Sequence, residues 1–213
     1  MTMGRGTIHG MALVLGLGMF SAAWAGPEED YKAGYDAYRK GDMTTAIKSL
    51  ERAASANNVR AQTLLGQMLD AADNNAQALK YYRMAADQGD AEAAFYIGVM
   101  YRSGDGVEKN EKEGIDWVRK AAEKGFPPAV AAMAGYYMTG GRGGPAPADQ
   151  QSEEAKRWIL AAAEQDNLPA MRAVVDGYKN GRHGFSKDAA QAAAWEAKLK
   201  AKQKPAEKAE ESK

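Results

Sequence analysis

Apolar residues recur at helical spacing along almost the whole chain beyond its apolar N-terminal segment. Trp117, Ala121 and Ala122 fall at i, i+4 and i+5, which places them on one face of a helix, and Tyr81 and Trp158 begin similar stripes. These stretches are rich in Ala, Lys, Glu, Gln and Met, which favour helix. No convincing segment alternates apolar and polar residues with the period of two that indicates a strand. The pattern predicts an all-α fold.

The same pattern returns along the chain, so the sequence contains an internal repeat with five visible units. With Gly98 as the reference, the corresponding residues are Tyr35, Gly66, Gly135 and Val175. A second set of small residues follows at Ala46, Ala78, Gly114, Ala155 and Ala192. The distance from this second set to the next reference is nearly constant, whereas the distance from each reference to its own second set varies. Because loops tolerate extra residues and helices do not, each unit is predicted to be two helices joined by a variable loop, with a tight turn between units.

Gly66, Gly98 and Gly135 are predicted to lie in the middle of first helices, where glycine costs about 1 kcal/mol relative to alanine. Because glycine recurs at equivalent positions despite this loss of helix stability, we expect a neighbouring helix to approach there too closely for any side chain. The aromatic residues expected to fill the adjoining core are Trp117, Trp158 and Trp195. Such a unit cannot bury its apolar face alone, so stacking of units must form the core.

The segment AEAAFYIGVMYRSGDGVEKNEKEGIDWVRKAAEKG, residues 91–125, resembles a Sel1-like repeat, a relative of the tetratricopeptide repeat. Residues 59–90 and 127–165 resemble the same repeat, residues 168–200 resemble it less, and residues 28–57 look more like a tetratricopeptide unit. End units are expected to be atypical, because they cap the stack with a polar face. The resemblance implies an α-solenoid of about five antiparallel helix pairs over residues 26–200, which binds other proteins or peptides.

The resemblance also implies where a partner binds, because tetratricopeptide-like units line their groove with one outward stripe of the first helix. Carried onto this sequence, the stripe comprises Arg60, Thr63, Gln67, Asp70, Glu92, Phe95, Val99, Arg102, Tyr136, Arg172, Asp176 and Lys179. An aromatic centre with charged and polar ends is typical of protein interfaces. The alternative is that Phe95 and Tyr136 pack between repeats.

The first 25 residues are predicted to be a secretory signal peptide. Arg5 precedes the apolar run MALVLGLGMF, and Ala23 and Ala25 form the small-residue pattern that precedes cleavage, here after Ala25. The alternative is an uncleaved anchor, but the apolar run is about half the length that a transmembrane helix needs. We therefore expect a periplasmic or secreted protein that is not inserted in a membrane after cleavage.

Composition argues against several classes of function. The 28 Lys and Arg residues balance 28 Asp and Glu residues, which leaves no basic surface typical of nucleic-acid binding. The chain has no cysteine and only two histidines, so Cys–His catalysis and zinc sites with several histidines are excluded. We expect no catalytic residue, no cofactor and no metal. Residues 201–213 mix Lys and Glu and are expected to form a charged, disordered tail.

The loop SGDGVEKN, residues 103–110, offers Asp105 and Glu108 as oxygen ligands but lacks the alternating acids of a calcium loop. We interpret it as a connector in which Gly104 ends the first helix in the left-handed conformation, Val107 packs back and Asp105 points to water.

Two further loop features lack a catalytic pattern. TGGRGGPAPADQ, residues 139–150, has neither the spacing of a phosphate-binding loop nor a preceding strand, so a flexible insertion is predicted, with a partner-contact loop as the alternative. His183 is predicted to be an exposed loop residue.

Together these patterns predict an exported, non-enzymatic scaffold that binds a protein or peptide on the concave face of the solenoid. The alternative is a periplasmic regulatory subunit of a membrane sensor or of a secretion or envelope-assembly system. A cell-wall-acting enzyme is a further alternative, which would need converging acids or an activated nucleophile.

Overall fold

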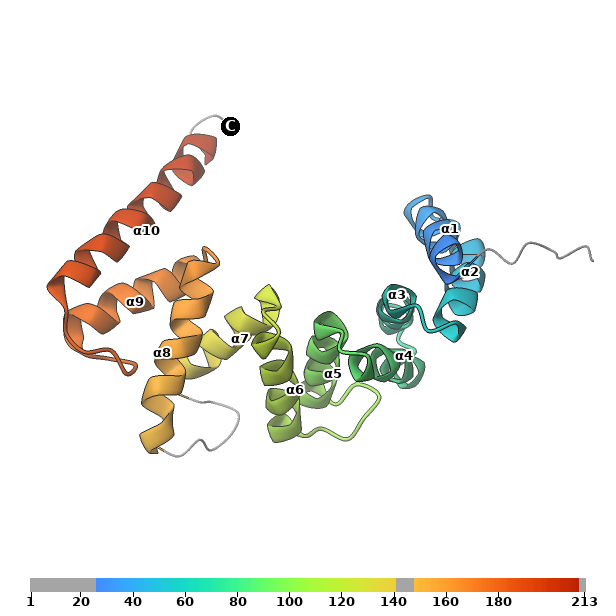
Figure 1. Ribbon diagram of the computed structural model, residues 1–213, viewed down its shortest axis with the longest axis horizontal. Helices are drawn as coiled ribbons and strands as arrows, with labels where there is room; N and C mark the ends of the chain where they lie inside the picture. Colours follow the sequence, from blue (N-terminus) through green and yellow to red (C-terminus); the bar gives the residue numbers. More distant parts are fainter. Residues whose placement is uncertain (1–25, 141–147, 211–213) are drawn as a thin grey trace, which may run out of the picture.

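The computed structural model describes residues 26–140 and 148–210 (Figure 1). The predicted signal peptide, residues 141–147 of the glycine-rich loop and residues 211–213 lie outside the described part. The described residues form ten helices and no strand. These helices are α1 Pro27–Arg39, α2 Met43–Ser55, α3 Val59–Asp70, α4 Asn75–Asp87, α5 Ala91–Ser103, α6 Glu111–Glu123, α7 Pro127–Met138, α8 Ala148–Glu164, α9 Leu168–Asn180 and α10 Ala189–Glu210.

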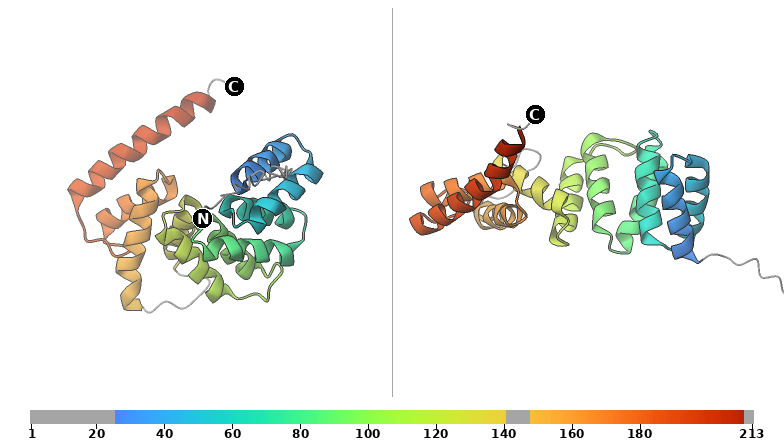
Figure 2. Two further views of the ribbon diagram at one scale, coloured as in Figure 1. Left: turned by 45° about the vertical axis from the view of Figure 1, so that its right-hand side comes forward. Right: turned by 90° about the horizontal axis from the view of Figure 1, so that it is seen from above.

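Successive helices pack in pairs, from α1 with α2 to α9 with α10, and each pair packs on the next pair along the chain. The array curves, so that α1 and α10 lie on the same side of the central pair α5–α6 (Figure 1), and Figure 2 shows the same succession of pairs from two other sides. This arrangement confirms the α-solenoid that the sequence predicts. The core follows the array, because buried apolar residues form successive clusters along it.

The constant turn between units has a backbone that the sequence sets locally. Its left-handed residues are Asn57, Gly89, Gly125 and Asp166. In three of the turns the next residue caps the following helix through its side-chain oxygen; these caps are Asn58, Asp90 and Asn167. Helix α7 begins instead at Pro127, whose ring fixes a helical φ. The predicted tight turn of constant length is confirmed.

The close-approach glycines are partly as predicted. A Cβ atom at Gly66 would lie 2.5 Å from the Tyr82 ring, and one at Gly98 would lie 2.7 Å from Val118 Cγ2, so both positions require glycine. A Cβ at Gly135 would meet no described atom of another helix within 4 Å, so this part of the prediction is wrong. The equivalent residue of α7 is Ala134, which is completely buried, because Pro127 fixes where the helix begins.

The reference residue of the first unit is also displaced by one position. Gly34 of α1 is buried against Leu50, whereas Tyr35 is 40% exposed. One residue turns a helix by about 100°, so a shift of one position exchanges a core residue for a surface residue.

The second set of small residues is buried, at Ala46, Ala78, Gly114, Ala155 and Ala192. Trp158 and Trp195 are core residues, at 4% and 6% exposure. Trp117 is partly buried and packs against the same core. The aromatic positions of the second helices therefore join neighbouring units, as the sequence predicts.

The two end pairs differ from expectation. The first pair does not present a purely polar surface, because Tyr35, Tyr38, Met43 and Ile47 are all at least 37% exposed. At the other end, α10 continues as a helix to Glu210, so residue 200 does not mark a helix end. No helix in the described ranges has the length and apolar character needed to cross a bilayer.

Candidate functional site

Residues of the predicted stripe connect the first helices of the first three pairs. Gln67 Nε2 on α3 donates a hydrogen bond of 2.7 Å to Glu92 Oε1 on α5. Arg60 on α3 forms an ion pair with Glu28 on α1, and its guanidinium carbon lies 4.6 Å from the centre of the Tyr31 ring. The stripe is therefore continuous from α1 to α5.

A cavity of about 520 Å³ lies where α3, α4 and α5 meet, next to the Gln67–Glu92 hydrogen bond. The polar residues that line it are Gln67, Asp70, Asp73, Asn75, Tyr82, Tyr96 and Asp105. Gln67 and Asp70 belong to the predicted stripe. The sequence pattern did not assign the other five to a site, because they come from the following helices and from two loops.

The ring of Tyr82 forms the inner part of this cavity. Tyr82 is fully buried against Gly66, where the absence of a side chain makes room for the ring. It stacks on Tyr96, with 5.2 Å between ring centres. Burial raises the pKa of Tyr82, so its hydroxyl keeps its proton. The buried Tyr82 hydroxyl has no hydrogen-bond partner among the described residues.

Three carboxylates surround the same space without a neutralising partner. Asp70, Asp73 and Asp105 form no ion pair with any described residue. Burial raises the pKa of Asp70, and the negative charges of Asp105 and Asp73 raise it further. Across the described ranges, no three His, Cys, Asp or Glu side chains are grouped so that they could hold a metal ion. The geometry provides an anionic cavity rather than a metal cage.

The loop 103–110 places Asp105 at this cavity. Gly104 has φ +92° and ends α5, as predicted, and Val107 packs against the adjoining core. Gly106 has φ +69° and lies so close to α4 that a Cβ would come within 2.8 Å of the Asn75 backbone. The loop is therefore a connector with a second consequence, because its contact with α4 holds Asp105 beside the other two carboxylates. The sequence signal for this role is an aspartate between two glycines.

Replacing Asp70 with asparagine is expected to stabilise the free protein at neutral pH by about 0.5 kcal/mol, because it removes like-charge repulsion at a partly buried site. The raised pKa means that the folded state binds the Asp70 proton more tightly than the unfolded state does. The stability contributed by that proton is present at low pH and is lost as the pH rises above 3.8, the ordinary pKa of an aspartate side chain. Urea denaturation of both proteins between about pH 4 and 7 measures this, and the difference should shrink toward pH 4. A variant that is less stable at neutral pH would contradict the repulsion.

The middle residues of the predicted stripe contribute more to packing. Thr63 is 5% exposed, and its hydroxyl donates to the backbone oxygen of Val59. Phe95 packs on Phe126, the residue before the next unit, with 5.5 Å between ring centres. Tyr136 makes an edge contact with Tyr137. Phe95 and Tyr136 are thus half-buried among aromatic neighbours, and the contact of Phe95 with Phe126 is packing between repeats of the kind that the alternative interpretation describes.

The other members of the stripe are more accessible. Val99 is 39% exposed and Arg102 is exposed on α5, close to the cavity loop. In the last unit, Arg172 is exposed, Asp176 accepts a hydrogen bond from Asn180, and Lys179 forms an ion pair with Glu196 on α10. Helix α9 packs on α7, α8 and α10, so these last residues form a separate group at the far end of the array.

Two loop predictions concern the second half of the chain. His183 lies in the α9–α10 loop with φ +53° and is half-buried, so it is less exposed than predicted. The glycine-rich loop falls mostly outside the described residues.

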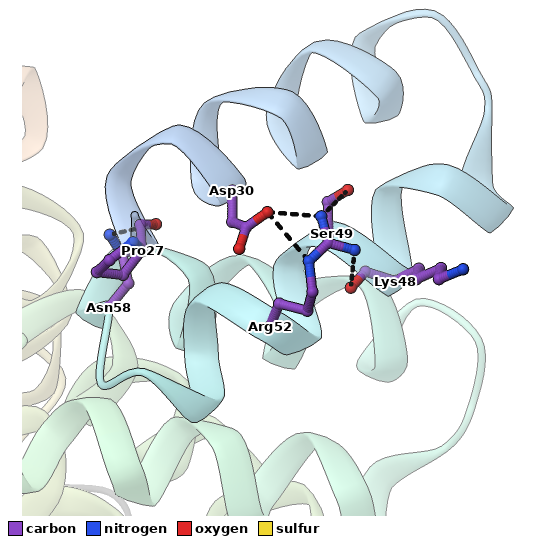
Figure 3. Close-up of polar contacts among 6 residues, drawn as sticks. All are labelled: Pro27, Asp30, Lys48, Ser49, Arg52 and Asn58. Carbon is purple, nitrogen blue, oxygen red and sulfur yellow. Dashed lines mark hydrogen bonds and ion pairs between the residues drawn. The ribbon is translucent and has the colours of Figure 1, made fainter. Parts of the chain in front are cut away.

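The buried acid Asp30 has a structural role. Figure 3 shows Asp30 on α1 directed at Arg52 on α2, whose nitrogen atoms lie 2.5 Å and 3.1 Å from Asp30 Oδ1. Arg52 also donates to Ser49 Oγ. Because this carboxylate has its cation within the chain, it needs no ligand. The contrast with Asp70, Asp73 and Asp105 identifies the α3–α5 cavity as the candidate site.

Comparison with known proteins places the chain among repeat proteins. Residues 59–90, 91–126 and 127–167 match the model of the Sel1 repeat. The crystal structure of a Sel1 repeat protein from Oxalobacter formigenes superimposes with a TM-score of 0.64 at 27% identity, over 82% of this chain and 72% of that one. The structure of c5321, a protective antigen with an SLR fold from uropathogenic Escherichia coli, gives a TM-score of 0.68 at 29% identity, over 82% of this chain and 38% of that one.

Curated relatives match over shorter segments. DAP3-binding cell death enhancer 1 of Rattus norvegicus is 33% identical over 86 residues, which are 39% of this chain and 17% of that protein. Chitin synthase regulator SKT5 of Saccharomyces cerevisiae is 30% identical over 109 residues, which are 48% of this chain and 16% of that protein. The chain thus spans less than a fifth of either relative. The family match covers about half of this chain and coincides with helix pairs α3–α4, α5–α6 and α7–α8, and the chain therefore belongs to the Sel1 repeat family.

Proposed function

We propose that this protein is an exported, non-enzymatic scaffold that binds a protein or peptide along the first helices of its repeats. Proteins of the Sel1 repeat family are typically interaction scaffolds, and this chain has the repeat array of that family. The observation that carries the proposal is the α3–α5 surface, where the stripe residues Gln67 and Asp70 line a cavity. Its three carboxylates have no ion-pair partner, and its buried Tyr82 hydroxyl has no hydrogen-bond partner, among the described residues.

The chemistry of this surface favours docking over turnover. An enzyme needs an acid, base or nucleophile aligned with a second group that activates it. The carboxylates at the cavity repel one another, and the neighbouring tyrosine is held protonated by burial. Such groups hold a ligand by charge and hydrogen bonding. The names of two relatives are consistent with this role, since one is described as binding DAP3 and the other as regulating chitin synthase.

Export is the second part of the proposal, and it rests on the N-terminal sequence pattern. We place the mature protein, from Gly26 onward, in the periplasm of a Gram-negative bacterium or outside the cell. A cleaved leader predicts that the protein recovered from the envelope fraction begins at Gly26. Recovery of the full chain from the cytoplasm alone would refute this part.

Site-specific cross-linking tests the binding surface. A photo-reactive amino acid is placed in the full chain at Val99, exposed on the first helix α5, or at Lys80, exposed on the second helix α4. After illumination of the source cells, the Val99 variant should give one discrete protein adduct that is absent from the Lys80 variant. Equal adducts from both positions, or an adduct from Lys80 alone, would overturn the proposed surface.

A further inference from the structure

We propose that the cavity between α3, α4 and α5 is a subsite for a basic side chain, an arginine or lysine of the bound protein or peptide. This inference deepens the proposed scaffold function and rests on it, because it specifies the chemistry by which a partner is recognised. The walls of the cavity provide three separate reasons, in charge, in hydrogen bonding and in access.

Charge is the first reason. Asp70, Asp73 and Asp105 come from the end of α3, the α3–α4 turn and the α5–α6 loop, and each lines the cavity. They have no cationic partner among the described residues, whereas the buried acid Asp30 has Arg52. The free protein therefore holds these like charges together at a cost, and a guanidinium or ammonium group would relieve that repulsion.

Hydrogen bonding is the second reason. Tyr82 lines the cavity, and its hydroxyl is buried and has no partner among the residues that the structure describes. A buried polar group without a partner costs free energy, so such groups in folded proteins call for an explanation. The lone pairs of the hydroxyl oxygen can accept an N–H bond from an arginine or lysine, and carboxylates can accept the remaining N–H groups. Tyr96, stacked on Tyr82, adds an aromatic surface of the kind that attracts cations.

Access is the third reason. Asp73 and Asp105 are exposed at the rim, whereas Tyr82 is fully buried, so the polar groups extend from the surface inward. A long, flexible side chain with a cationic tip matches this arrangement, because its stem can lie along the partly exposed Tyr96 while its charge meets the carboxylates. The volume of about 520 Å³ lies within the range typical of ligand sites. A free amino acid would bring its own carboxylate into an anionic site, which favours a peptide-borne side chain.

Titration with small probes tests the subsite without knowledge of the partner. The probe is N-acetyl-arginine amide, which carries a guanidinium group on a neutral backbone, added to the full mature chain and followed by two-dimensional NMR. We expect saturable shifts at Gln67, Tyr82 and Tyr96 with a dissociation constant in the millimolar range. N-acetyl-citrulline amide has the same shape without the charge and should bind at least fivefold more weakly. Free arginine should bind more weakly than the amide.

Two variants complete the experiment. Asp70→Asn should weaken binding of N-acetyl-arginine amide at least fivefold while keeping the free protein folded, because it removes repulsion. Asp87→Asn is the matched control. Asp87 is exposed at the C-terminal end of α4, whereas the cavity lies near the N-terminal end of this helix at Asn75, so this variant should leave binding unchanged. Equal binding of the arginine and citrulline probes, or unchanged binding in Asp70→Asn, would overturn the proposal. Binding of Ca²⁺ at the same residues that is tighter than binding of N-acetyl-arginine amide would also overturn the proposal, in favour of a metal-ion site.

The outcomes also separate the subsite from the scaffold function. If Val99 cross-links a partner but Asp70→Asn neither reduces that adduct nor affects the arginine probe, the subsite is wrong and the scaffold stands. If the arginine probe binds as expected but no adduct forms at Val99, the proposed partner surface fails and the cavity remains a cation-binding pocket.

Discussion

Replacing Trp158 with alanine is expected to lower the free energy of unfolding by about 3–5 kcal/mol, the usual cost of removing a large buried aromatic side chain. Trp158 is 4% exposed in the core shared by the last three helix pairs, and its indole N–H donates to Glu154. For a chain of this size the loss corresponds to a midpoint of thermal unfolding lower by roughly 6–20 °C. Thermal and urea denaturation followed by far-ultraviolet circular dichroism measure it.

The matched control is Trp117→Ala at the equivalent position of the previous unit. Trp117 is only partly buried, and Lys120 covers its ring from the solvent side. We expect less than half of the Trp158 effect, because less apolar surface is exposed by the change. Equal losses at the two positions would contradict the burial difference that distinguishes these units.

Alanine at Gly98 is expected to destabilise the protein by about 1–3 kcal/mol, although alanine favours helix more than glycine does. The new Cβ would lie 2.7 Å from Val118 Cγ2 and 2.8 Å from the backbone oxygen of Gly114. A backbone oxygen cannot rotate away as a side chain can, so α5 and α6 would have to separate. Urea denaturation monitored by circular dichroism gives the change.

Gly135→Ala is the matched control, and its effect should have the opposite sign. No described atom outside its own helix lies within 4 Å of a Cβ built at Gly135, so the helix preference of alanine should stabilise the protein by up to about 1 kcal/mol. The pair thus tests the corrected register of α7. Destabilisation by Gly135→Ala to the same extent as Gly98→Ala would restore the register expected from sequence alignment.

Sequence patterns were sufficient for much of the repeat architecture, for local reasons. Helix caps, left-handed turn residues and proline at a helix start act within a few residues of the chain, as in the turn of Asp166 and Asn167 before α9. The apolar stripe of each second helix is similarly local, which is why Trp158 and Trp195 were predicted as core residues. Local sequence patterns gave the wrong buried residue in α7, where either of two adjacent positions could be aligned with Gly98. Gly135 resembled Gly98 in its neighbours, but the start of α7 at Pro127 places Ala134 at the buried position.

The candidate site was only half visible in the sequence. Gln67 and Asp70 could be placed on an outward stripe because the repeat resemblance implies one, and helical spacing puts both residues on one face. Tyr82 was hidden, because its burial against Gly66 depends on how α4 packs on α3. The segment SGDGVEKN shows the same division. The sequence by itself determined its helix stop at Gly104, since a left-handed residue is a property of the local backbone. Only the tertiary structure decided that Gly106 contacts Asn75 and thereby holds Asp105 beside Asp70, because that approach depends on the packing of two successive repeats.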